Sequence, residues 1–350
     1  MTVTVAVIGA GADPDTVGPE GFSMGYRHAE AIQSIDECTL VGVADIVEEN
    51  AVAFADAYDL GDEAVFTDVA ELVDERSPDM VTVAVPPHVH ADVVIECARG
   101  GVEAIHCEKP IAATWADSRL LCQEAARFGV QLTFNHQRRF KPSWELAQEL
   151  LADGAVGDIE RVETYATNLY DWGTHCLDAL GFFTDDVPAD WVLAGLDYRT
   201  ENVWFGVHNE NHATVSWEYE NGIHGHAFTG GPWNPLDCRH RICGSEGELR
   251  VDVTDGPGID VRRYDGDGST HDPEGADAIQ LAMAEVVTAY RTDGTSRLAA
   301  TNALNGTEII FAAYESVRQR GRVELPLEIE DHPLETMVSE GTLTPVDTDD

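Results

Sequence analysis

Short apolar runs rich in β-branched residues alternate with amphipathic stretches along the first 134 residues of this chain of 350. Strands that read as continuous apolar runs and alternate with helices are typical of a parallel sheet covered on both faces. The alternation therefore predicts a doubly wound α/β domain over residues 1–134. The expected strands are Val3–Ile8, Thr39–Ala44, Met80–Val85, Val102–Cys107 and Gln131–Phe134, and the expected helices are Gly25–Ser34, Val47–Tyr58, Val69–Arg76, Val89–Arg99 and Trp115–Phe128.

Residues 135–330 follow a different pattern, in which one strand between two helices is followed by a run of strands. The segment Thr214–Glu220 alternates polar and apolar residues, and Asn221-Gly222 is a hairpin signal before Ile223–Thr229. We expect an α+β domain here with a large, mostly antiparallel open sheet, and a loosely ordered tail over residues 331–350. The other expected helices are Pro142–Ala152, Trp172–Phe183, Ala276–Tyr290 and Arg297–Arg318, and the other strands are Ile159–Thr167, Cys238–Cys243, Glu248–Val253 and Ile259–Tyr264.

Acidic residues outnumber basic ones by 64 to 21, which gives a formal net charge of -43. Such a surface repels nucleic acid and anionic membranes, so neither is expected as a partner. The excess is spread along the chain, and only Lys109 and Lys141 are lysines. This composition indicates a halophilic, haloarchaeon-like cytosol in which salt screens self-repulsion, with an acidic mesophilic protein as the alternative.

No apolar run approaches the ~20 residues that a bilayer requires, and no basic region precedes the first apolar stretch, so we expect a cytoplasmic protein. The seven cysteines form no Cys-x-x-Cys pair, which favours reduced thiols.

Histidines crowd the expected sheet, and His224 and His226 would share one strand face. No cysteine or carboxylate stands at a recognisable ligand spacing from them, so no metal site is expected.

The first strand runs into Gly9-Ala10-Gly11, and a helix is expected from Gly25. In the dinucleotide-binding pattern G-x-G-x-x-G, the first glycine permits a tight turn and the second lets backbone amides approach the pyrophosphate. The third lets the helix pack closely against the strand. Gly9, Gly11 and Gly25 fit these roles if residues 13–23 are an insertion. We expect the insertion to be a flap beside the pyrophosphate, with a solvent loop or an oligomer contact as the alternatives.

The second strand is followed by Asp45, which lies about 25 residues after Gly9 once the insertion is subtracted, near the offset of roughly 20 seen in dinucleotide sites. A carboxylate there accepts hydrogen bonds from the ribose hydroxyls of the adenosine half and repels a 2′-phosphate. Ile46 and Val47 supply no neighbouring cation. NAD is therefore expected in preference to NADP.

Two further segments carry a resemblance to a known family. They are Val85-Pro86-Pro87-His88-Val89-His90 and Glu108-Lys109-Pro110, which ends an expected strand. With the displaced glycine pattern, they resemble the Gfo/Idh/MocA family of NAD(P)-dependent sugar and inositol oxidoreductases. The resemblance covers residues 3 to about 326 and includes residues 135–142, 154–159 and 171–175.

The resemblance implies where several residues lie. Pro86 and His90 are implied to lie near the cofactor, and Glu108 near the nicotinamide ribose. Asp171 and His175 match the Asp-x-x-x-His pair that the family places near the nicotinamide. The family usually has a glycine-rich lead into this pair, whereas here residues 168–170 are Asn-Leu-Tyr, which leaves the substrate class open.

The chemistry of three residues supports the same interpretation. Lys109 stands at the end of a core strand in a chain with almost no lysine, which favours a chemical role over one at a helix end. Asp171 and His175 are four residues apart on an expected helix, so the carboxylate is able to orient the imidazole. A structural pair on a solvated face is the alternative. We expect His175 to be the general base, Asp171 to orient it, and Lys109 to stabilise the developing alkoxide.

The predicted enzyme thus oxidises a hydroxyl of a sugar or polyol. Asn135, Arg138 and Asp171 are the candidate substrate contacts, the first two because they stand where the chain passes between domains. Tryptophans at 172, 217 and 233 are able to stack on a sugar, although large aromatics on a sheet are more often core or interface. We expect a homodimer or homotetramer through the C-terminal sheet, because exposed sheet faces require cover.

Two other functions stay open. The resemblance also implies NAD-dependent glycoside hydrolases, which oxidise a sugar carbon transiently and accumulate no NADH. It implies as well non-catalytic sugar or nucleotide sensors with this fold, which lose the catalytic residues. The presence of Lys109, Asp171 and His175 together counts against a sensor.

Overall fold

The computed structural model describes residues 2–14, 23–231 and 234–345, which form two compact units. The first unit holds the residues up to Ala113, Asp117–Gln137 and Ala276–Thr301. The second holds Thr114–Ala116, Arg138–Gly275 and the residues from Asn302 onward. These bounds differ from the expected division at residues 134 and 330, because residues 276–301 join the first unit.

Six strands form the sheet of the first unit. They are β1 (Val3–Ile8), β2 (Cys38–Ala44), β3 (Val65–Phe66), β4 (Met80–Val83), β5 (Ala104–Cys107) and β6 (Gln131–Phe134). The helices are α1 (Met24–Gln33), α2 (Glu48–Ala57), α3 (Val69–Arg76), α4 (His90–Arg99), α5 (Trp115–Phe128) and α8 (Ala278–Thr292), with 3₁₀ turns at Asp62–Ala64, Pro87–Val89 and Gln137–Phe140.

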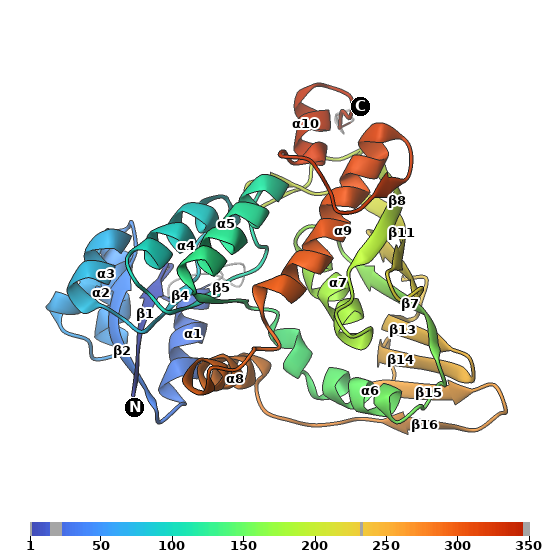
Figure 1. The fold of residues 1–350 in the computed structure, drawn as a ribbon, viewed down its shortest axis with the longest axis horizontal. Helices are drawn as coiled ribbons and strands as arrows, with labels where there is room; N and C mark the ends of the chain where they lie inside the picture. Colours follow the sequence, from blue (N-terminus) through green and yellow to red (C-terminus); the bar gives the residue numbers. More distant parts are fainter. Residues whose placement is uncertain (1, 15–22, 232–233, 346–350) are drawn as a thin grey trace. The chain divides into compact units, whose positions relative to one another are not determined.

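All neighbouring strands of this sheet are parallel, in the order β3-β2-β1-β4-β5-β6. In Figure 1, α1 and α8 lie on one side of the sheet and α4 and α5 on the other. Every residue of β4 and β5 is buried, as a strand covered on both faces requires. The doubly wound parallel sheet is thereby confirmed. The strand order reverses between β1 and β4, and open α/β sheets bind ligands at the carboxyl ends of such strands.

Helix α8 belongs to the first unit, whereas the sequence pattern grouped it with the second domain. Arg27 of α1 pairs with Asp277 at 3.0 Å, and the Gln131 side-chain amide donates to the carbonyl of Val286 at 3.1 Å. The helix buries Met283 and Val286 on one face. Periodicity predicts that such a face exists but not which distant surface covers it.

The second unit is built on a nine-stranded sheet. Its strands are β7 (Ile159–Ala166), β8 (Ala189–Asp197), β11 (His212–Tyr219), β12 (His224–Thr229), β13 (Cys238–Gly244), β14 (Gly247–Val253), β15 (Ile259–Arg263), β16 (Gly268–His271) and β17 (Val323–Glu324), with a separate pair β9 (Val203–Trp204) and β10 (Val207–His208). The helices are α6 (Pro142–Ala152), α7 (Trp172–Phe183), α9 (Ala300–Gln319) and α10 (Pro333–Ser339).

The strand order is β16-β15-β14-β13-β7-β12-β11-β8-β17, and only β7 and β12 are parallel neighbours. The expected mostly antiparallel sheet is thereby confirmed. The β11–β12 hairpin turns at Asn221 and Gly222, whose φ of +82° lies in the left-handed region that glycine adopts freely. Helices α6, α7 and α9 lie on one side of the sheet in Figure 1.

The other face of this sheet is more exposed. Alternate residues of β11 are buried, from Ala213 to Tyr219, and those between them are exposed or half-buried. Leu193 on β8 is 47% exposed. The expected loose tail contains a helix instead, α10, because Leu334 and Met337 at i and i+3 give it an apolar face that is buried.

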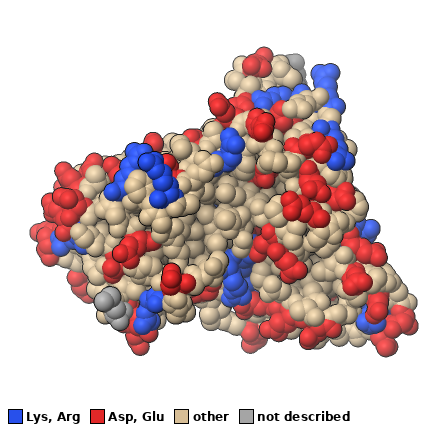
Figure 2. All heavy atoms as spheres, viewed as in Figure 1, with Lys and Arg blue, Asp and Glu red and all other residues tan. Residues whose placement is uncertain are grey.

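Acidic side chains are spread over the visible surface in Figure 2 rather than gathered in one block. No helix within the described ranges is long and apolar enough to cross a bilayer.

All seven cysteines lie in the described part of the chain, and each is free. Burial raises the pKa of Cys97 to about 12, so this thiol is a weak nucleophile at neutral pH.

Candidate active site

The three glycines of the predicted dinucleotide pattern meet at the end of β1. Gly9 and Gly11 have φ of +86° and +72°, which only glycine adopts readily. A Cβ on Gly9 would lie 2.7 Å from the carbonyl oxygen of Ala84, and one on Gly25 only 2.5 Å from that of Gly9. Gly25 therefore lets α1 approach the turn closely, which is the role of the third glycine in the pattern. Residues 15–22 of the insertion lie outside the described residues, so the flap stays a prediction.

Asp45 is fixed at this same turn. One carboxylate oxygen, Oδ2, accepts a hydrogen bond from the amide of Gly11 at 3.0 Å, and Oδ1 accepts one from the amide of Val47 at 2.9 Å. Ile46 beside it is 93% exposed. A carboxylate held at a glycine turn, with no cationic side chain next to it in sequence, fits the ribose of an adenosine group. The residues present thus fit a dinucleotide.

Glu108, at the end of β5, is buried in a polar network of the first unit. Its Oε1 accepts a hydrogen bond from the Asn135 amide at 2.7 Å and lies 3.0 Å from Nε2 of the buried His28. Burial by itself raises the pKa of Glu108. The hydrogen bonds from His28 and Asn135 and the charge of Lys109 outweigh that effect and hold this pKa at about 2. Glu108 is therefore a carboxylate at neutral pH.

His90 lies between the segment that follows β4 and the segment that follows Lys109, an arrangement that we call the His90 clamp. Its Nε2 lies 2.8 Å from the carbonyl oxygen of Val85, and its Nδ1 lies 3.0 Å from the carbonyl oxygens of Pro110 and Ile111. Burial lowers the pKa of His90, although these backbone hydrogen bonds oppose the shift. Pro86 stands within the clamped segment. The backbone of Lys109 is thus held on both sides. Oε2 of Glu108 accepts a hydrogen bond from the Lys109 amide at 3.2 Å, and the His90 clamp holds the residues that follow Lys109.

Asp171 and His175 stand at the start of α7 in the second unit, and they are 6% and 4% exposed. Asp171 is the N-cap, so both lie in the first turns of the helix. The Asn168 side chain accepts hydrogen bonds from the amides of Asp171 at 3.1 Å and Trp172 at 2.8 Å. Asn168 therefore satisfies two of the N–H groups at the start of α7 and helps to fix where this helix begins.

Glu210 holds the loop in front of α7, and sequence reasoning missed it. Its Oε1 accepts hydrogen bonds from the Leu169 amide at 2.8 Å and the Thr229 hydroxyl at 2.6 Å, and its Oε2 accepts one from Tyr314 at 2.7 Å. Burial raises the pKa of Glu210, while these donors oppose the shift. The contacts join residues up to 104 apart in sequence, so no local signal could have found them.

Arg138 stacks on Trp172, with Cζ 4.2 Å from the centre of the indole ring. It lines a cavity of about 490 Å³ in the second unit, which Lys141 and Arg239 also line. Sequence reasoning selected Arg138 and considered Trp172 but missed Arg239 and Lys141. Trp217 is completely buried, and Trp233 lies outside the described residues.

The structure thus brings the predicted residues together in separate groups. In the first unit, Gly9, Gly11, Gly25 and Asp45 share the glycine turn, while Glu108 and Asn135 share the network beside Lys109. In the second unit, Asp171, His175 and Arg138 gather at the N-terminus of α7. Among the described residues, no group of three or more His, Cys, Asp or Glu side chains is placed to hold a metal ion.

Comparisons with known proteins agree with this fold. Residues 3–136 match GFO_IDH_MocA, described as an oxidoreductase family with an NAD-binding Rossmann fold. D-Apiose dehydrogenase from Paraburkholderia graminis is 25% identical over 361 residues, covering 91% of each chain. Inositol 2-dehydrogenase 1 from Saccharopolyspora erythraea is 31% identical over 191 residues, or 54% of this chain and 50% of that protein.

A solved structure extends the likeness to both units. An oxidoreductase from Agrobacterium radiobacter, crystallised with NAD+, L-tartaric acid and magnesium, has a TM-score of 0.75 at 18% identity over 93% of this chain and 98% of that one. Residues 3–136, which include the glycine turn, are thus similar to the NAD-binding Rossmann fold of that oxidoreductase family. The match and the relatives support the resemblance to the Gfo/Idh/MocA family that the sequence motifs indicated.

Proposed function

We propose that the chain is an NAD(P)-dependent oxidoreductase that transfers a hydride between a hydroxyl-bearing carbon of a sugar or polyol and a nicotinamide cofactor, with NAD preferred. The observation that carries this proposal is the contact between Asp45 and Gly11. It holds a carboxylate at the glycine turn, where a ribose is bound and a 2′-phosphate is repelled. The names of the two relatives, which are dehydrogenases of D-apiose and inositol, support a sugar or polyol as substrate.

Lys109, Asp171 and His175 are the proposed catalytic group. A bound NAD would supply the acceptor for the hydride of the carbinol carbon. His175 removes the hydroxyl proton as general base, and Asp171 orients the imidazole and binds an adjacent hydroxyl. Lys109 donates a hydrogen bond to the reacting oxygen, and a donor of this kind in a water-poor site contributes about 3 kcal/mol to transition-state stabilisation.

The surroundings of these residues support such roles. The His90 clamp and Glu108 fix the backbone on both sides of Lys109. Asn168 fixes the backbone at Asp171, so the chain bearing this carboxylate is placed before substrate arrives. Catalytic groups act best when packing and hydrogen bonds hold them in advance, because their reorganisation then costs little during the reaction.

Five further residues are proposed to support the cofactor and the substrate. Pro86, His90 and Glu108 hold the loops beside the cofactor, and Arg138 binds substrate. Asn135 does so as well, while its side-chain amide supports Glu108. The exposed sheet face, which includes Leu193, is the proposed surface for a homodimer or homotetramer. The salt-rich cytoplasm suggested by the composition stays a prediction.

The proposal is tested with a panel of aldoses, inositols and deoxysugars, with NAD or NADP, in about 2 M KCl. Absorbance of reduced nicotinamide and the amount of oxidised product are both measured. The expected result is one reduced cofactor per product molecule, with a higher kcat/KM for NAD. Cleavage of a glycoside without net reduction of NAD contradicts the proposal in favour of a glycoside hydrolase. Sugar binding without turnover contradicts it in favour of a sensor.

A further inference from the structure

Cationic side chains gather in the 490 Å³ cavity of the second unit, although the chain as a whole carries a net charge of -43. The cavity lies where β7 and β14 end, where β13 begins, and at the start of α6 and α7. Arg138, Lys141 and Arg239 line it together with one carboxylate, that of Asp252, which leaves a formal net charge of +2. We call this space the cationic cavity.

The single carboxylate of the cationic cavity is already engaged. Oδ2 of Asp252 accepts hydrogen bonds from the Lys141 ammonium at 2.7 Å and the Trp144 indole N–H at 3.1 Å. Its Oδ1 accepts one from the Ser143 hydroxyl at 2.8 Å. Asp252 is paired with Lys141 at 2.7 Å and its charge also acts on Arg138, so it offsets the positive charge of the cavity only in part.

Arg138 and Arg239 have no carboxylate within ion-pair distance among the residues that the structure describes. The Arg239 guanidinium donates to a backbone carbonyl, that of Tyr165, at 2.8 Å. The neighbouring Arg139, by contrast, forms ion pairs at 2.7 Å with both Asp178 and Asp186. In a chain with three acids for every base, a pair of such arginines on one cavity is a specific feature.

Trp172 keeps both guanidinium groups at the cavity. The Cζ atoms of Arg138 and Arg239 lie 4.2 Å and 5.7 Å from the centre of its indole ring, within the range of cation–π attraction. Burial lowers the pKa of Arg138, which shows that its charge is poorly solvated there. An anion that enters the cavity would replace the lost hydration, and a planar guanidinium matches the oxygens of a carboxylate or phosphate.

The cationic cavity lies near the proposed catalytic residues of α7, because Arg138 in its lining interacts electrostatically with Asp171. Trp172 directly follows Asp171 and precedes His175 by three residues, a rise of about 4.5 Å along the helix. One end of a sugar bound at Asp171 and His175 would therefore reach the cavity. We infer that Arg138 and Arg239 bind an oxyanion carried by the substrate, a carboxylate or a phosphate, so that the enzyme prefers an acidic sugar to a neutral one. This inference rests on the proposed function.

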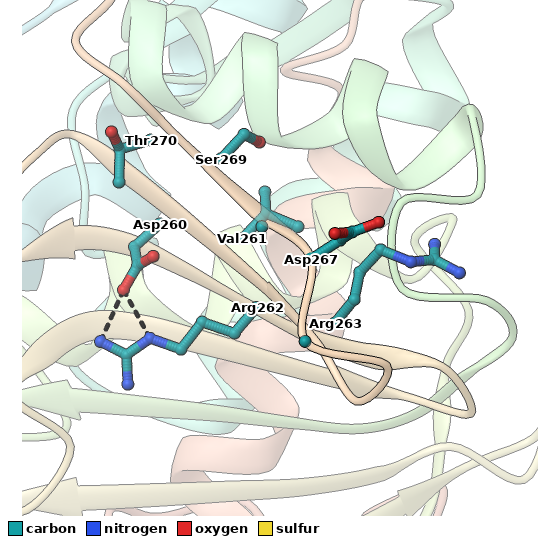
Figure 3. A pocket seen from close by; sticks show the side chains of 9 residues that line it. Asp260, Val261, Arg262, Arg263, Asp267, Ser269 and Thr270 are labelled. Atoms are coloured by element: carbon teal, nitrogen blue, oxygen red, sulfur yellow. Dashed lines mark hydrogen bonds and ion pairs between the residues drawn. The ribbon is translucent and has the colours of Figure 1, made fainter.

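A second cavity supplies the matched control. It has a volume of about 400 Å³ and lies at the edge strand β16 and its neighbour β15 (Figure 3). Arg262 in that cavity is 53% exposed and pairs with Asp260 at 2.7 Å. Its charge is thus already matched, and an Arg262→Gln substitution removes the same charge as Arg239→Gln at a site to which no substrate contact is assigned.

The test compares an aldose with the uronic acid and the sugar phosphate of the same ring, in the same KCl concentration. For wild type, kcat/KM is expected to be about tenfold or more higher for at least one acidic member than for the aldose. Arg239→Gln should raise KM for that member about tenfold, with kcat and the aldose parameters little changed. The kcat/KM values for the uronic acid and the sugar phosphate, compared with each other, show whether a carboxylate or a phosphate is bound. Equal kcat/KM for all three sugars, or Arg239→Gln behaving like Arg262→Gln, would overturn the inference.

Equilibrium binding separates this inference from the proposed function. Calorimetric titration with the uronic acid and the sugar phosphate, without nicotinamide cofactor, measures binding of the acidic sugar independently of turnover. Binding that is lost in Arg239→Gln but not in Arg262→Gln supports the anion site even if no sugar is oxidised. Oxidation of neutral sugars together with no acid binding leaves the proposed function intact and rejects the anion site. Should Arg239→Gln fail to fold, Arg239→Lys keeps the charge, loses the planar fork and is expected to weaken binding.

Discussion

The carboxylate of Asp45 accepts a hydrogen bond from the amide of Gly11, with 3.0 Å between Oδ2 and the nitrogen. The contact joins the end of β2 to the turn after β1, so one side chain is fixed beside the glycines of the dinucleotide pattern. An acidic group in this position is able to bind a ribose diol and to repel a phosphate on the same ribose.

Replacing Asp45 with alanine tests this role. The variant should bind NAD about tenfold more weakly, because a charge-assisted hydrogen bond to the ribose is lost, and should discriminate less against NADP. Titration of both cofactors by protein fluorescence measures the two Kd values. Asp56→Ala, which removes an exposed carboxylate from α2, is the control. Unchanged Kd values for both cofactors in Asp45→Ala would remove Asp45 from the site.

Gly25 allows α1 to approach the glycine turn, and alanine there would place a Cβ 2.5 Å from the carbonyl oxygen of Gly9. Backbone on both sides has to move apart, which typically costs 1–3 kcal/mol, or roughly several degrees in Tm. We expect Gly25→Ala to lower Tm and to weaken NAD binding. Gly195→Ala on β8 is the matched control, because a Cβ there meets nothing within 4 Å. Equal behaviour of the two variants would show that α1 does not need this close approach.

The buried Glu108 makes stability depend on acidity. Its folded pKa of about 2 lies below the ordinary value, so its stabilising contribution is present above about pH 4.5 and is lost as the pH falls towards 2. At pH 7 the Glu108→Gln variant should be less stable by roughly 2–3 kcal/mol. Urea unfolding across this pH range should show the difference from wild type shrinking with acid. A difference in unfolding free energy that stays constant with pH would contradict the low pKa of Glu108. An equal effect of Glu49→Gln, at an exposed site, would contradict it as well.

The pH profile of turnover tests His175. A general base has to be deprotonated to accept the hydroxyl proton, so kcat/KM of the wild type should fall on the acidic side. His175→Ala should lose about 10²–10⁴-fold in kcat, and its residual activity should lack the acidic limb. The measurement is kcat/KM from about pH 5 to pH 9 for both proteins. An acidic limb of the same shape in His175→Ala would assign the proton transfer to another group.

Local features of the fold were predictable from the sequence. Several elements, such as β1 and α7, begin and end as predicted, because apolar runs and helical periodicity are properties of neighbouring residues. Strand β8 was missed. Its burial does not follow a clean alternation, and its place in the sheet depends on pairing with β11 and β17. Asp45 was selectable as a candidate because the offset between a glycine turn and the next strand end is set by one β–α–β unit.

Residues that act through long-range contacts were not predictable. Glu210 contacts Leu169, Thr229 and Tyr314, and nothing near Glu210 in sequence marks it as buried. Arg239 reaches Trp172 only because β13 pairs with β7. Lys141 did carry a signal, since it is one of two lysines, but its partner Asp252 is 111 residues away. The cationic cavity is thus a property of sheet register rather than of any motif.

The most direct test of the account is turnover of wild type and of Lys109→Met on the best sugar found, with NAD binding measured on the same preparations. We predict that the variant loses turnover by about 10²-fold or more, the loss typical of a removed charge-stabilising donor, while its NAD Kd stays within severalfold of wild type. Unchanged turnover in Lys109→Met, at an unchanged NAD Kd, would contradict the proposed chemistry.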